Sequence, residues 1–223
     1  MRGAHRYMAS DSLPQEVPVF PLTGALLLPH GMMPLNIFEP RYLNLIEDAL
    51  GNGRYVALIQ PRDAESETVA DDAPIYSVGC LGRITSFTES DDGQFQIILS
   101  GLCRFRTVRE LEIKNSYRRI EPDYTPFLGD LPEETEVLAD RKLLMATLNQ
   151  YFEHGNIDVE GAGLEEMDDH TLVTTMSMAC PFDPREKQAL LECSGLVERG
   201  RLLQTLLVMD SHGEEGNANT NRH

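Results

Sequence analysis

The sequence predicts an α+β fold in which a β-barrel-like unit is followed by a bundle of α-helices. Residues 17–43 are largely apolar but contain five prolines, which cut the segment into strand-sized pieces. Proline has no backbone donor, so such pieces belong at sheet edges, strand starts or bulges. From Asp130 onwards the apolar residues recur at helical spacing instead. We therefore expect a curled, interrupted sheet in the first half of the chain and helices in the second.

The first elements follow from this pattern. They are short strands at 17–22, 26–28 and 34–38, a helix at 40–50 and a strand at 54–60. Pro40 suits the first turn of the helix and Gly51 suits its end. The acidic segment 61–74 has no periodicity and is expected to be a loop.

The clearest local pattern is a β-hairpin formed by 75–88 and 94–109. The segment between them, 89–93, ends in Asp-Gly, which readily adopts the positive backbone angles of a turn. Glycines inside the two strands indicate bulges or close backbone approach, as a small closed barrel requires; they are Gly79, Gly82 and Gly101. A last strand is expected at 116–120 and a linker at 122–132.

Four helices are expected in the second half. The first runs from Asp130 to Gly155, and the second starts at Asp168 or Asp169. Asp183 and Glu186 have the spacing of a capping box for the third helix, and Ser194 can cap the fourth. The expected organisation is a flexible N-terminal tail at 1–14, a β-barrel subdomain at 15–125, an α-helical subdomain at 126–209 and a disordered polar tail at 210–223.

Composition narrows the possible partners. The net charge is −17, and residues 130–223 carry 19 acidic against 7 basic side chains. The negative electrostatic field of such a chain repels phosphate backbones, which disfavours nucleic acid as a partner. No apolar run approaches the roughly 20 residues that span a bilayer, and residues 1–11 lack the apolar core of a signal peptide. We expect no membrane contact and a cytoplasmic location.

No motif indicates catalysis, a metal or a cofactor. A phosphate-binding loop needs a lysine after glycine, and none of the three lysines follows one. The acidic run 165–170 is expected to cap a helix, because consecutive carboxylates point in different directions. The GxxG at 79–82 lies in a strand pattern, which favours barrel geometry over a nucleic-acid clamp. The four cysteines form no CxxC pair and are predicted to be buried, reduced thiols.

The candidate peptide- or partner-binding residues are Met32, Met33, Arg41, Tyr42, Arg104 and Arg106. Flexible thioethers suit surfaces that accept varied apolar peptides, which favours the two methionines. Arg41 and Tyr42 can anchor a partner. Alternatively, Arg41 can tie the first helix to the barrel while Tyr42 packs there. The two later arginines can pair with acids of the helical half, or they can dock an acidic or C-terminal carboxylate group.

Several segments resemble the Lon N-terminal domain family. They are PVFPL at 18–22, LLPHG at 27–31, LNIFEPRY at 35–42, YSVGCLGRI at 76–84, SGLCRFR at 100–106 and EKQALLE at 186–192. The resemblance spans about residues 15–209. It implies a PUA-like pseudo-β-barrel followed by a C-terminal α-helical bundle. It also implies a substrate-recognition role, in which the chain binds unfolded polypeptide segments or a partner protein.

Full Lon proteins are ATP-dependent proteases, but this chain has neither a Walker A motif nor a Ser-Lys peptidase site. The resemblance is therefore to the recognition domain standing alone, without catalysis. Two other roles remain open: an RNA-binding module, because PUA-like barrels include such modules, and a subunit or adaptor of a larger proteolytic assembly. A metal-independent hydrolase would need a nucleophile-base pair, and the sequence nominates none.

Overall fold

The computed structural model describes residues 13–62, 70, 72–132, 137–155 and 163–218, with side chains as far as Ser211. The chain divides into two compact units between residues 134 and 135. The first unit contains a six-stranded sheet and the second contains helices. This arrangement confirms the α+β class.

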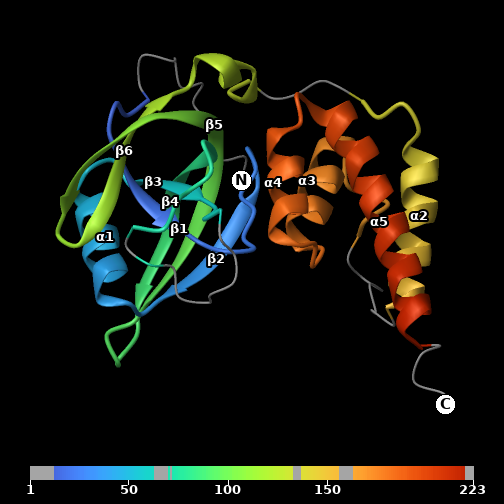
Figure 1. Cartoon of the computed structure of the whole chain (residues 1–223), viewed down its shortest axis with the longest axis horizontal. Coiled ribbons are helices and arrows are strands. Elements are labelled where there is room, and N and C mark those ends of the chain that lie inside the picture. Colours follow the sequence, from blue (N-terminus) through green and yellow to red (C-terminus); the bar gives the residue numbers. More distant parts are fainter. Residues whose placement is uncertain (1–12, 63–69, 71, 133–136, 156–162, 219–223) are drawn as a thin grey trace. The chain divides into compact units, whose positions relative to one another are not determined.

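The sheet of the first unit closes on itself. Its strands are β1 (Val17–Pro21), β2 (Met32–Ile37), β3 (Tyr55–Ile59), β4 (Val78–Glu89), β5 (Phe95–Lys114) and β6 (Tyr117–Asp123). They lie in the order β2-β5-β4-β3-β1-β6, and β5 also pairs with β6. The pairing of β1 with β3 is parallel and the other pairings are antiparallel. The resulting sheet is strongly curved (Figure 1).

The curvature centres on the 20-residue strand β5, which pairs with β2, β4 and β6. A Cβ atom at Gly101 would lie only 2.0 Å from the carbonyl oxygen of Leu28. The Gly101 N–H donates to the Gly31 carbonyl, and the His30 N–H donates to the Gly101 carbonyl. Next to this contact the register of β4 and β5 shifts by one residue, as in a β-bulge. The predicted role of Gly101 in close backbone approach is confirmed.

The structure differs from the sequence prediction at residues 26–28, which form no strand. The three leucines are nonetheless buried, with at most 2% of their surface exposed. The backbone turns here, because the Gly31 N–H donates to the Leu28 carbonyl. The segment therefore fills the core without joining the ladder.

A second difference is a hairpin between β5 and β6. The predicted strands ended at 109 and began at 116, whereas β5 continues to Lys114 and β6 starts at Tyr117. The two connecting residues, Asn115 and Ser116, have φ angles of 48° and 70°, as a tight hairpin turn requires. Asn-Ser is a weaker turn signal than Asp-Gly, so the pattern did not reveal it.

Helix α1 (Pro40–Gly51) packs against β1, β3 and β6 through its buried face, which includes Leu45 and Ile46. Asp48 fastens this helix to the β5–β6 hairpin. Its Oδ2 accepts hydrogen bonds from the Tyr117 hydroxyl at 2.6 Å and the Asn115 side chain at 2.9 Å. The bond from Tyr117 is the main reason why the pKa of Asp48 lies below its usual value.

The core of this unit contains Leu13, Val17, Val19, Ala57, Ile59, Leu81, Phe105 and Ile120. Leu13 belongs to it, and the Tyr124 hydroxyl donates to the Pro14 carbonyl. These two residues are therefore packed, although the sequence predicted a flexible tail at 1–14. The remainder of that tail, 1–12, lies outside the described residues.

The helices beyond α1 are η2 (Thr125–Asp130), α2 (Arg141–His154), α3 (Asp169–Ala179), α4 (Pro184–Glu192) and α5 (Leu196–Ala218). Helix α2 starts eleven residues later than predicted, because Asp130 belongs to η2 in the first unit. The capping box of Asp183 and Glu186 is confirmed. The backbone of α5 is helical as far as Ala218, where disorder was predicted from 210. No helix in the described part of the chain could cross a bilayer.

A buried ion pair fastens η2 to the barrel. The Nη2 and Nε atoms of Arg104 donate to Asp130 at 2.7 and 2.9 Å, and the Arg104 backbone N–H donates to the same carboxylate. Both side chains are only 4% exposed. The guanidinium also lies 4.8 Å from the Phe127 ring centroid. Arg104 is thus a structural residue.

Replacing Asp130 with Ala should lower the free energy of unfolding by about 3 to 5 kcal/mol, because it leaves the buried Arg104 charge unpaired. Arg109→Ala is the matched control. It breaks an ion pair with Glu121 whose side chains are 66% and 41% exposed, so the loss should stay below about 1 kcal/mol. Urea denaturation followed by circular dichroism measures both. Equal losses in the two variants would contradict the structural role of the buried pair.

All four cysteines are free and buried, as predicted. Burial raises the pKa of the Cys103 thiol to about 12 and that of Cys180 to about 11, and it also raises the pKa of Cys80. The thiolate is the reactive form. The folded protein should therefore react slowly with thiol reagents.

At pH 8 we expect little labelling by a disulfide reagent until the protein is unfolded, when all four thiols should react. As the pH of the folded protein rises, Cys180 should react before Cys103, because its pKa is lower. Mass spectrometry of the labelled peptides gives the order. Complete labelling of the folded protein within a minute at pH 8 would be incompatible with buried thiols.

Candidate functional site

The structure places the six predicted binding residues in three separate regions of the first unit. Met32 and Met33 lie on β2, and Arg41 and Tyr42 lie in the first turn of α1. The last two, on β5, differ sharply in environment. Arg104 is 3% exposed and paired with Asp130, so it is not available to a ligand.

Arg106 is exposed on β5, two residues beyond Arg104. It lies opposite Asp123 on β6 in the strand register. Its charge contributes to the lowered pKa of Asp123, after the hydrogen bonds that Asp123 accepts from Thr125. Arg104 and Arg106 therefore do not form a common docking site.

An exposed, partly apolar face follows β2, and we call its apolar residues the outer β2 surface: Met32, Pro34, Phe38 and Ile98. The polar Asn36 is exposed on the same face of the strand. Pro34 lies directly opposite Ile98 in the antiparallel register. Met32 is 70% exposed and Phe38, just beyond the strand, is 64% exposed. Met33 lies on the other face, opposite the buried Leu99. Of the two predicted methionines, Met32 is the one that faces solvent.

Strand β2 also has an open edge. Among the described strands it pairs with β5 only. An unpaired edge can accept another strand, and proteins often blunt such edges with proline. Pro34 supplies no backbone donor in the middle of β2. The edge can therefore contact an extended chain without favouring continuous sheet growth.

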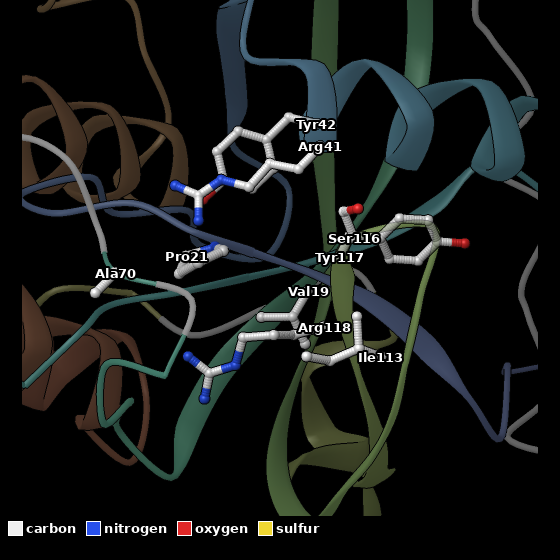
Figure 2. A pocket seen from close by; sticks show the side chains of 9 residues that line it. All are labelled: Val19, Pro21, Arg41, Tyr42, Ala70, Ile113, Ser116, Tyr117 and Arg118. Carbon is white, nitrogen blue, oxygen red and sulfur yellow. The ribbon is translucent and has the colours of Figure 1, made fainter.

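A pocket of about 220 Å³ lies where α1 meets β1 and the β5–β6 hairpin; we call it the α1 pocket. Its lining residues, drawn in Figure 2, are Val19, Pro21, Arg41, Tyr42, Ala70, Ile113, Ser116, Tyr117 and Arg118. Two of the predicted residues, Arg41 and Tyr42, thus meet in one concave site. The chain fold adds Arg118 to them.

Tyr42 forms part of the wall, because its ring is buried against Phe20, with 4.3 Å between the two ring centroids. Arg41 lies over the Tyr42 ring, with 4.6 Å between its Cζ atom and the ring centroid. Its Nε and Nη2 atoms donate to Glu39 at 3.1 and 2.9 Å. The structural alternative for Tyr42, packing against the barrel, is thus borne out. The ion pair of Arg41 with Glu39 is local, because the two residues are only two positions apart in the sequence.

Sequence reasoning missed Arg118 and Ile113 as members of this pocket. They lie on opposite sides of the 114–117 turn. The pocket forms only because that turn returns β6 to the side of α1. Asn115 and Ser116 could have indicated the turn, since asparagine tolerates positive φ angles. Their spacing alone did not indicate a site.

The acidic run 165–170 caps α3, as predicted. Asp168 accepts a hydrogen bond from the Thr171 N–H at 2.8 Å, which lowers its pKa. Asp169 pairs with Arg141 at 2.7 Å. Within the described residues, no group of three or more histidine, cysteine, aspartate or glutamate side chains could hold a metal ion.

Comparison with known proteins finds a family that matches most of the chain. A family model described as the ATP-dependent protease La (LON) substrate-binding domain matches residues 16–209. Lon protease of Heliobacterium modesticaldum is 24% identical over 88% of this chain and 24% of its own length. Lon protease of Flavobacterium johnsoniae is 27% identical over 91% of this chain and 25% of its own. The chain thus spans about a quarter of each of these relatives.

Among solved structures, a Lon N-terminal domain protein from Xanthomonas campestris superimposes with a TM-score of 0.59. It is 23% identical, and the match covers 86% of this chain and 97% of the other. This likeness supports the fold. Together with the family match over most of the described residues, it leads to one assignment: the chain belongs to the ATP-dependent protease La (LON) substrate-binding domain family.

Proposed function

We propose that this chain is a non-catalytic recognition module that binds exposed or unfolded polypeptide segments. The observation that carries the proposal is the outer β2 surface beside the open edge of β2. Met32, Phe38 and Ile98 expose apolar area there, and β2 has one strand partner among the described strands. The family match to a substrate-binding domain supports it.

The chemistry of this surface favours weak, sequence-tolerant binding. A thioether side chain adapts its shape to different apolar partners. An added strand would meet carbonyl acceptors along β2 but an incomplete set of donors, because Pro34 has none. Side-chain burial, rather than a complete backbone ladder, would then supply most of the affinity.

Absence of catalysis is part of the proposal. The family model that matches this chain describes a substrate-binding domain. Burial raises the pKa values of Cys80, Cys103 and Cys180, which disfavours these thiols as nucleophiles. Four free, buried thiols also suit a reducing compartment, so we place the protein in the cytoplasm.

Replacing Met32 with Ser should weaken binding of a fluorescent unfolded polypeptide about tenfold, because a buried methionine side chain contributes roughly 1.5 kcal/mol or more. Met209→Ser is the matched control. Met209, on α5, is 64% exposed against 70% for Met32, and its replacement should leave the affinity unchanged. Fluorescence anisotropy titrations measure both variants.

The affinity for an uncharged apolar peptide should change little between low and high salt, since ions do not screen apolar burial. Equal affinities of the Met32 and Met209 variants would exclude the outer β2 surface as the binding site. No binding of any unfolded polypeptide by the unmodified chain would contradict general peptide recognition.

A further inference from the structure

We infer that the α1 pocket is a second recognition site, which takes the C-terminal carboxylate of a polypeptide whose last side chain is apolar. The inference rests on the proposed polypeptide-binding function, but it uses a surface distinct from the outer β2 surface. Three features of the pocket support it: the two arginines of its lining, the fixed orientation of their guanidinium groups, and its small, partly apolar interior.

The lining of the pocket is unusual for this acidic chain. Among the described residues, its lining includes Arg41 and Arg118 and no acidic side chain, although the whole chain carries a net charge of −17. Each arginine has an acidic partner that is more exposed than itself. The Arg41 side chain is 17% exposed and Glu39 is 35% exposed; the Arg118 side chain is 9% exposed and Glu110 is 45% exposed. The guanidinium groups are therefore more deeply buried than the carboxylates that pair with them, and they lie nearer the interior of the pocket.

The guanidinium groups are oriented before any ligand arrives. Glu110 accepts from Nε and Nη2 of Arg118 at 2.9 and 2.6 Å, and the Ala73 carbonyl accepts from Nη1 at 2.7 Å. These bonds use three of the five N–H groups that an arginine carries. In Arg41 the same two nitrogens donate to a single oxygen, Oε2 of Glu39. In Figure 2 both guanidinium groups point to the same side of the pocket, with Pro21 between them.

The remaining walls suit an apolar side chain. Val19 and Tyr42 are buried, Pro21 lies between the arginines, and Ile113 is 64% exposed. The volume of about 220 Å³ is below the range of roughly 300 to 1,000 Å³ that is usual for small-molecule sites. It fits one residue better than a chain passing through. A terminal residue presents a carboxylate and an apolar side chain together, which matches both kinds of wall.

The test compares two fluorescent peptides of identical sequence that end in leucine, one with a free carboxylate and one amidated, using the full chain at low salt. The acid form should bind about tenfold more tightly, because it adds charge-assisted hydrogen bonds. This preference should shrink as salt is raised. Equal affinities of the two forms would overturn the inference.

Two variants locate the effect. Arg41→Gln should reduce the preference for the acid form, and Ile113→Glu, which adds a negative charge to an exposed lining position, should abolish it. Val108→Glu is the matched control: Val108 lies on the same strand, is 58% exposed and does not line the pocket. An unchanged preference in Ile113→Glu, or an equal loss in Val108→Glu, would remove the α1 pocket from consideration.

An amidated peptide with one internal aspartate separates a terminal carboxylate from a side-chain carboxylate. It should bind like the plain amide; affinity equal to that of the acid form would overturn the terminal assignment. Failure of this inference is distinguishable from failure of the proposed function. In the first case both peptide forms bind equally and Met32→Ser still weakens them, whereas in the second neither form binds.

Discussion

The curvature of β5 at Gly101 is the constraint on which the rest of the first unit depends. The strand must pair with β2 and β4 along its first half and with β4 and β6 along its second, so it has to bend between them. The bend brings its backbone against the Leu28 carbonyl, where a Cβ atom would lie 2.0 Å away. Only glycine fits this contact. Both proposed binding surfaces lie at the ends of the strands that this bend positions.

The position of a residue relative to β5 determines whether its side chain is structural or can face a ligand. Near its middle, Arg104 turns inward to Asp130 and holds η2 on the barrel. At the far end, the hairpin to β6 is fastened to α1 through Asp48, and the α1 pocket lies beside this attachment. At the start of β5, strand β2 pairs with it, and the other edge of β2 stays open among the described strands. The two buried arginines thus have different surroundings, Arg104 in the interior and Arg118 at a pocket.

Much of the fold could be predicted from the sequence, because the signals were local. Asp-Gly marked the β4–β5 turn, Asp183 and Glu186 marked the start of α4, and glycines marked the bend of β5. Residues 26–28 were misassigned because an apolar run does not distinguish a strand from a buried turn. The α1 pocket could be predicted only in part. Arg41 and Tyr42 are adjacent in the sequence, whereas Arg118 joins them through tertiary contacts, which no local spacing encodes.

The central claim is that polypeptide recognition belongs to the barrel unit and uses the outer β2 surface and the α1 pocket. Hydrogen exchange of the full chain, with and without a saturating leucine-terminated unfolded peptide, tests it most directly. The account predicts added protection in β2, in the first turn of α1 and in the β5–β6 hairpin, with α2 to α5 unchanged. Added protection confined to the helical unit, with the barrel unchanged, would contradict the account.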